Sequence, residues 1–82
     1  MSEDMSFKEL IKAIAVELVD NPDQVVVTEI ASDHNSVIEL RVAKSDIGKV
    51  IGRDGRTAQS MRTVLAAMST KVGKKAHLDI VD

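Results

Sequence analysis

Residues 47–57 decide the fold, and they read Ile47-Gly48-Lys49-Val50-Ile51-Gly52-Arg53-Asp54-Gly55-Arg56-Thr57. This stretch places three glycines at the junction of two predicted helices. Because glycine has no Cβ, Gly52 and Gly55 can turn the chain sharply and let a sugar-phosphate backbone approach the peptide groups. The N–H groups that begin the second helix add a partial positive charge at the same place. The pattern therefore predicts a loop that binds an anionic backbone.

Basic side chains surround this loop. Arg53 and Arg56 can contact phosphates, and Lys49 is close by in the sequence. Residues 41–82 carry a net charge of +5, whereas residues 1–40 carry −7, so the overall charge of −2 hides a strong asymmetry. Because Asp54 lies inside the loop and repels phosphate, we expect weak binding that depends strongly on salt.

Other glycine-rich loops have requirements that this stretch does not meet. A Walker loop needs Ser or Thr directly after Gly-Lys, but Gly48-Lys49 is followed by Val50. A dinucleotide-binding fingerprint needs Gly-x-Gly-x-x-Gly directly after a strand, whereas a helical turn precedes this loop. These two functions are excluded. A plain tight turn between helices, with no ligand, remains the alternative.

The chain before the loop begins with a predicted amphipathic helix. Apolar residues from Phe7 to Val19 recur at a spacing of three and four residues, which places them on one helix face. Ser6 can cap the first turn, with Glu9 three residues later as in a capping box. The helix ends at residues 20–22, because Pro22 cannot continue the hydrogen-bond ladder.

Two strands follow this helix. Residues 24–31 are rich in β-branched side chains, and residues 37–43 alternate between apolar and polar side chains. Residues 32–36 between them have turn chemistry and are too few for a crossover, so the strands should pair antiparallel with His34 at an exposed tip.

The remaining segments complete the predicted fold. Ser45 can cap a short helix through Ile51, and a long helix over residues 56–72 ends at Gly73. A last strand over residues 76–81 should lie parallel to the second strand, since two helices connect them. We therefore expect one α+β domain over residues 1–82, in the order α-β-β-α-α-β, with a three-stranded mixed sheet and three helices packed on one face. On the long helix, one face is expected to enter the core through Ala58, Met61, Val64, Leu65, Met68 and Val72.

Composition excludes several classes of function. Without cysteine there is no disulfide or thiolate site, and the two histidines lack metal-ligand spacing, so we expect no metal or other cofactor. No run approaches the roughly 20 apolar residues of a membrane span, and the N-terminus is acidic. A protein with no membrane association, located in the cytoplasm, is expected. Asp54 and Ser60 lack the partners that a catalytic site requires, so we expect no enzyme.

The loop and its setting resemble the KH family of RNA-binding domains. The hallmark of that family is a helix ending in Ile-Gly, two variable residues, Gly, and a second helix, which matches Ile51-Gly52-Arg53-Asp54-Gly55. The order of elements is similar to the bacterial type II arrangement. The stretch from Lys49 to Thr57 closely resembles the small stand-alone KH proteins of the KhpA family, and the resemblance covers almost the whole chain.

This resemblance implies an RNA site at residues 52–55. The loop would grip the backbone of about four nucleotides of single-stranded RNA, with the bases in an aliphatic groove. Phe7, the only aromatic residue, is assigned to the core, so aromatic stacking is not available. By position, the groove wall would be formed by Ile47, Val50 and Ile51. The complete predicted site is Ile47, Lys49, Val50, Ile51, Gly52, Arg53, Asp54, Gly55 and Arg56.

The resemblance leaves two functions open. One is a non-catalytic module that binds RNA with low specificity, as an RNA chaperone or post-transcriptional regulator. The resemblance links this function to cell elongation and division. The other is a protein-interaction module that forms a homodimer, or a heteromer with a larger RNA-binding partner, KhpB, with RNA binding secondary. A small chain also gains stability from a buried dimer surface. Nothing in the loop visibly selects RNA over single-stranded DNA.

Overall fold

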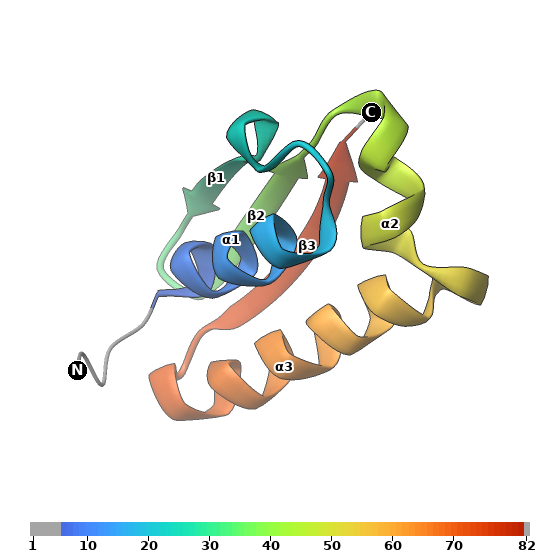
Figure 1. Cartoon of the computed structure of the whole chain (residues 1–82). Helices are drawn as coiled ribbons and strands as arrows, with labels where there is room; N and C mark the ends of the chain where they lie inside the picture. The colour runs from blue at the N-terminus through green and yellow to red at the C-terminus, as the bar shows by residue number, and fades with distance from the viewer. Residues whose placement is uncertain (1–5, 82) are drawn as a thin grey trace.

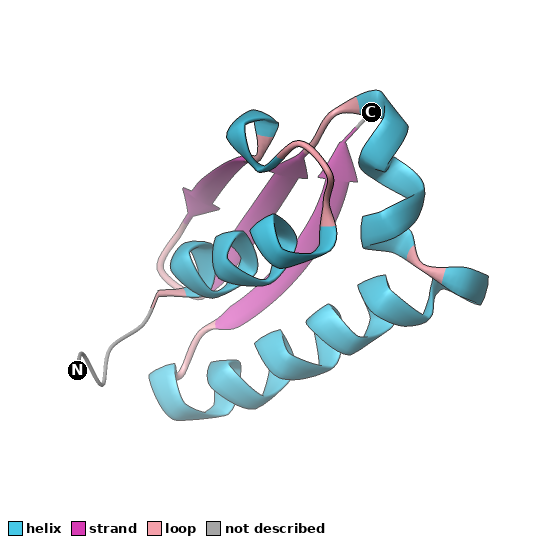
Figure 2. Ribbon diagram, viewed as in Figure 1, coloured by secondary structure: helices cyan, strands magenta, loops and turns pink. Residues whose placement is uncertain are grey.

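The computed structural model describes residues 6–81, which form a three-stranded sheet covered by helices (Figures 1 and 2). The strand order is β1-β2-β3, with β1 antiparallel to β2 and β2 parallel to β3. The order α-β-β-α-α-β and the three helices on one face confirm the predicted α+β fold. The helices are α1 (Phe7–Leu18), α2 (Ile47–Ile51) and α3 (Arg56–Val72), and the strands are β1 (Val26–Ala31), β2 (Asn35–Arg41) and β3 (Lys75–Val81).

The hydrophobic core lies between the helices and one face of the sheet. Ile11 of α1, Ile38 of β2 and Leu65 of α3 are almost completely buried there. The buried face of α3 is narrower than predicted, because the side chains of Val64 and Val72 are 40% and 57% exposed. The α3 side chains that are buried in the core are Ala58, Met61 and Leu65.

Within residues 6–81, no helix covers the opposite face of the sheet, which we call the open face (Figure 2). His77 and Asp79 of β3 are exposed, as their alternation with Leu78 predicts. His34 is exposed in the turn between β1 and β2, also as predicted.

One end of each long helix is capped as the sequence predicts, whereas α1 ends at Leu18, before the predicted residues 20–22. The Ser6 hydroxyl accepts a hydrogen bond from the Glu9 N–H at 3.1 Å, which caps α1. Gly73 adopts φ +69°, and its N–H donates to the Ser69 carbonyl at 2.9 Å, which closes the last turn of α3.

The strand boundaries differ from the prediction at both ends of the β1–β2 pair. Residues 22–24 form a 3-10 turn, so β1 begins at Val26 rather than at residue 24. The register pairs Ala31 with Ser36, which draws two predicted turn residues into β2 and leaves a turn of three residues. The Ser32 N–H closes this turn by donating to the Asn35 carbonyl at 2.8 Å.

Among residues 6–81, no helix is both long enough and apolar enough to span a membrane.

Candidate nucleic-acid interface

Residues 52–55 join α2 to α3 and project from one end of the molecule (Figure 1). The Gly52 N–H donates to the Gly48 carbonyl at 2.9 Å and thereby ends α2, while the Gly55 N–H donates to the Gly52 carbonyl at 3.1 Å. Three residues of the loop have positive φ angles: +78° at Gly52, +57° at Asp54 and +73° at Gly55. The loop is thus a compact turn whose backbone departs repeatedly from the helical conformation.

The two loop glycines are needed for different reasons. Gly52 has φ +78° and ψ 171°, a region that is essentially restricted to glycine. A Cβ there would overlap the Thr57 hydroxyl and lie 2.6 Å from Thr57 Cβ and 2.8 Å from its backbone nitrogen. At Gly55 a Cβ would meet no atom within 4 Å, so only the left-handed backbone favours glycine.

The loop presents positive charge to solvent. Arg53 and Arg56 are exposed, and among residues 6–81 every ion pair involves Lys49 instead. Gly55 occupies the N-cap of α3 and provides no side-chain acceptor, so no cap side chain covers the N–H groups of the first turn. The exposed Asp54 carboxylate lies between the two arginines in sequence and offsets part of their charge.

The aliphatic residues predicted for the groove wall have different environments. Ile51 is 38% exposed and Ile47 is half-buried, so both have surface that a ligand can contact. Val50 is fully buried in the core, so its side chain supports α2 from inside and cannot contact a base while the core is intact. For Val50 the prediction of direct contact is therefore corrected.

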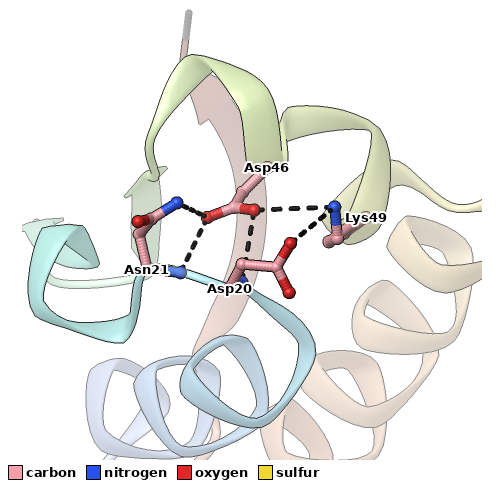
Figure 3. A network of polar contacts seen from close by, with 4 residues as sticks. All are labelled: Asp20, Asn21, Asp46 and Lys49. Carbon is pink, nitrogen blue, oxygen red and sulfur yellow. Dashed lines mark hydrogen bonds and ion pairs between the residues drawn. The ribbon is translucent and has the colours of Figure 1, made fainter.

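A buried carboxylate lies directly before α2 (Figure 3). The side chain of Asp46 is fully buried and accepts hydrogen bonds from the Asp20 N–H at 3.2 Å and from the Asn21 N–H at 3.1 Å. The Asn21 side-chain amide donates a third hydrogen bond at 3.0 Å, and Lys49 Nζ lies 3.7 Å from the carboxylate. We call these groups the Asp46 network.

Sequence reasoning missed this network. It predicted a short helix through Ile51 with Ser45 as its cap, but residues 44–46 form a 3-10 turn in which Ser45 makes no side-chain cap, and α2 begins at Ile47. The available signal was an acidic residue, Asp46, in a basic stretch. Its partners Asp20 and Asn21 are more than 20 residues away, so only the tertiary fold identifies them.

The structure places Lys49 in the Asp46 network rather than free beside the loop. Its Nζ also lies 3.3 Å from the exposed Asp20 carboxylate, and the Lys49 side chain is 43% exposed. Two carboxylates therefore share the charge of this predicted site residue.

The Asp46 network makes a pH-dependent contribution to stability. Burial alone would raise the pKa of Asp46, but the Asn21 side chain, the Asp20 and Asn21 N–H groups and the Lys49 ammonium together lower this pKa below the ordinary value of 3.8. A lowered pKa in the folded state stabilises the protein above the ordinary value, and this contribution disappears as the pH falls through the folded-state pKa.

We therefore expect stability from this group to be constant between pH 7 and about pH 5 and to fall below about pH 4. Across this pH range the melting temperature of Asp46→Asn should fall less on acidification than that of the wild type. Parallel acid profiles for the two proteins would contradict this assignment.

Comparison with known proteins identifies the family. Residues 8–80 match the family model described as KhpA/KhpB, KH domain. The RNA-binding protein KhpA of Aquifex aeolicus is 47% identical over 94% of this chain and 98% of its own length. The RNA-binding protein KhpA of Caldanaerobacter subterraneus is 49% identical over 89% of this chain and 97% of its own length.

A solved structure supports the fold. The crystal structure of Aquifex aeolicus Era bound to GDP and aluminium fluoride superposes with a TM-score of 0.62, covering 98% of this chain and 31% of Era. At 16% identity this similarity concerns the fold alone. The family match confirms the predicted resemblance and the prediction that the chain is not an enzyme. With its Gly-x-x-Gly loop between α2 and α3, the chain belongs to the KhpA/KhpB family of KH domains.

Proposed function

We propose that this protein is a non-catalytic RNA-binding protein that grips single-stranded RNA through residues 52–55. The observation that carries the proposal is the pair of exposed arginines, Arg53 and Arg56, at a positive-φ glycine loop. The uncapped first turn of α3 adds N–H donors at the same place. The names of the KhpA relatives, which are RNA-binding proteins, support the same ligand.

The proposed binding mode uses backbone and aliphatic contacts. About four nucleotides would lie along the loop, as in other KH domains. Ile47 and Ile51 offer apolar surface for the bases, while Phe7 is only 5% exposed and not accessible for stacking. Without aromatic platforms the site lacks the stacking energy of about 1–3 kcal/mol per base, so we expect modest affinity.

Several charges limit the strength of this binding. Asp54 lies within the loop, and the carboxylates of Asp20 and Asp46 engage Lys49. Weak RNA binding with little sequence specificity is consistent with an RNA chaperone or a post-transcriptional regulator that exchanges rapidly between transcripts. Because phosphate contacts dominate, the affinity should fall steeply as salt increases.

The double variant Arg53→Gln/Arg56→Gln tests the proposed phosphate contacts. Each lost contact should reduce the slope of log K against log[salt] by about 0.7, so the double variant should lose about 1.4 and bind more weakly at low salt. Fluorescence anisotropy with a labelled single-stranded oligonucleotide at several salt concentrations measures both quantities.

A matched control removes the same number of charges elsewhere. Lys8 and Lys12 are exposed on α1, and the variant Lys8→Gln/Lys12→Gln should keep the wild-type slope. If both double variants reduce the slope equally, the RNA is held by general charge and the loop assignment is wrong.

Self-association is the second candidate function. Val26 and Ile30 on the edge strand β1 are 51% and 58% exposed, and a second copy or a KhpB-like partner could cover them. Sedimentation at two concentrations measures the mass. If Val26→Ser/Ile30→Ser breaks a dimer and abolishes the cellular function while RNA affinity is unchanged, the result would favour an interaction module over the RNA function.

A further inference from the structure

The Asp46 network connects two segments that are far apart in the sequence. Its three N–H donors come from Asp20 and Asn21, which lie in the connection between α1 and β1, whereas the carboxylate lies directly before α2. Figure 3 shows the Asp46 side chain between this connection and α2. A fully buried carboxylate is tolerated only when its hydrogen bonds are satisfied, so these groups hold a defined geometry.

Helix α2 depends on such an anchor because it has little stability of its own. It has five residues, contains Gly48, and has no side-chain cap at its start. Val50, the fourth of its five residues, is buried in the core, and the Asp46 network fixes its start. Its last residue, Ile51, directly precedes the loop, so a shift at the start of α2 is transmitted to Gly52 within about two helical turns.

We propose that Asp46 is a positioning residue for the RNA site: by binding the α1–β1 connection, it sets the orientation of α2 and of the 52–55 loop. Lys49 belongs to this anchor and makes no essential phosphate contact. This inference rests on the proposed RNA function. It assigns a role to a residue that contacts no RNA and that the loop motif does not include.

A purely electrostatic effect of Asp46 and a positioning role predict opposite changes in RNA affinity for Asp46→Asn. Replacement by asparagine removes a negative charge close to the loop, and on electrostatic grounds alone RNA should bind more tightly. If Asp46 positions α2, the same replacement should weaken binding, because a neutral amide cannot accept all three hydrogen bonds at their present geometry. The sign of the change therefore separates the two effects.

The experiment compares Asp46→Asn with Asp20→Asn. Asp20 is a matched control, since its side chain is 76% exposed and among the described residues pairs with Lys49 alone. Its backbone N–H still donates to Asp46 in the variant. We expect Asp46→Asn to weaken RNA binding roughly fivefold at a temperature where it is fully folded. Asp20→Asn should bind up to about threefold more tightly, because it removes one nearby negative charge.

Two further measurements separate positioning from stability. The first is the ¹⁵N-¹H spectrum without RNA, in which Asp46→Asn should shift the amide signals of Gly52 and Gly55 while Asp20→Asn leaves them near their wild-type positions. The second uses Asn21→Ala, a milder variant that keeps the carboxylate and its two backbone donors. It should remain folded and show a smaller change of the same sign as Asp46→Asn.

The possible outcomes are distinct. Unchanged or tighter RNA binding by Asp46→Asn and Asn21→Ala, with unmoved loop signals, would overturn the positioning role and leave the RNA function intact. If the wild type binds no RNA, the proposed function fails, and the loop signals alone then decide whether Asp46 positions the loop.

Discussion

Replacement of Gly52 by alanine is expected to lower the free energy of unfolding by about 3 kcal/mol, because strain and overpacking each cost roughly 1–3 kcal/mol. The backbone at φ +78° and ψ 171° does not accommodate a Cβ, and that Cβ would meet Thr57 at both its side chain and its backbone nitrogen. Since the backbone is involved, truncation of Thr57 would not relieve the clash. For a domain of this size the melting temperature should fall by about 15 °C.

Gly48 provides the matched control for this prediction. It is exposed within α2, and a Cβ added there would meet no atom within 4 Å. Gly48→Ala should therefore stabilise the protein by about 0.5–1 kcal/mol, since alanine favours the helix. Chemical denaturation of both variants measures the difference, and equal stabilities for Gly52→Ala and the wild type would contradict the described loop.

Replacement of Gly55 by aspartate is expected to weaken RNA binding about tenfold relative to replacement by asparagine, since one added charge close to phosphate costs on the order of 1–4 kcal/mol. Gly55 has φ +73° and open space around its missing Cβ, and both aspartate and asparagine tolerate this left-handed backbone. The two variants thus carry similar strain and shape and differ by one charge.

This pair isolates the electrostatics of the loop. Both variants should have similar melting temperatures, and the difference in affinity should shrink as salt rises. Titration of the two proteins at low and high salt provides the measurement. Equal RNA affinities at low salt would mean that no phosphate lies close to residue 55.

The fold was predictable because local signals agree with one another. Ser6 caps α1, Gly73 ends α3, and the alternation around Leu78 places His77 and Asp79 on the open face. The predicted strand boundaries were less accurate, because strand pairing overrides the local turn preference of the sequence there. Ser36 has turn chemistry, yet it is fully buried in β2, and its hydroxyl donates to the Glu29 carboxylate at 2.9 Å.

The surroundings of the loop were predictable only in part. The glycines and arginines are contiguous, so a motif identifies them from the sequence. Burial separates the neighbours Val50 and Ile51, one in the core and the other at the surface, and five residues of helix give too little periodicity to distinguish them. The role of Asp46 and the pairing of Lys49 depend on contacts with residues 20 and 21, which no local pattern reveals.

Contact between residues 52–55 and RNA can be observed by NMR titration of ¹⁵N-labelled protein with a single-stranded RNA oligonucleotide. We predict that the largest amide shift changes occur within residues 48–58. Thr28 and Glu39, which the strand register places on the open face of the sheet with His77 and Asp79, should remain unchanged. Shift changes concentrated on that open face, with the loop unaffected, would show that RNA binds the sheet and not residues 52–55.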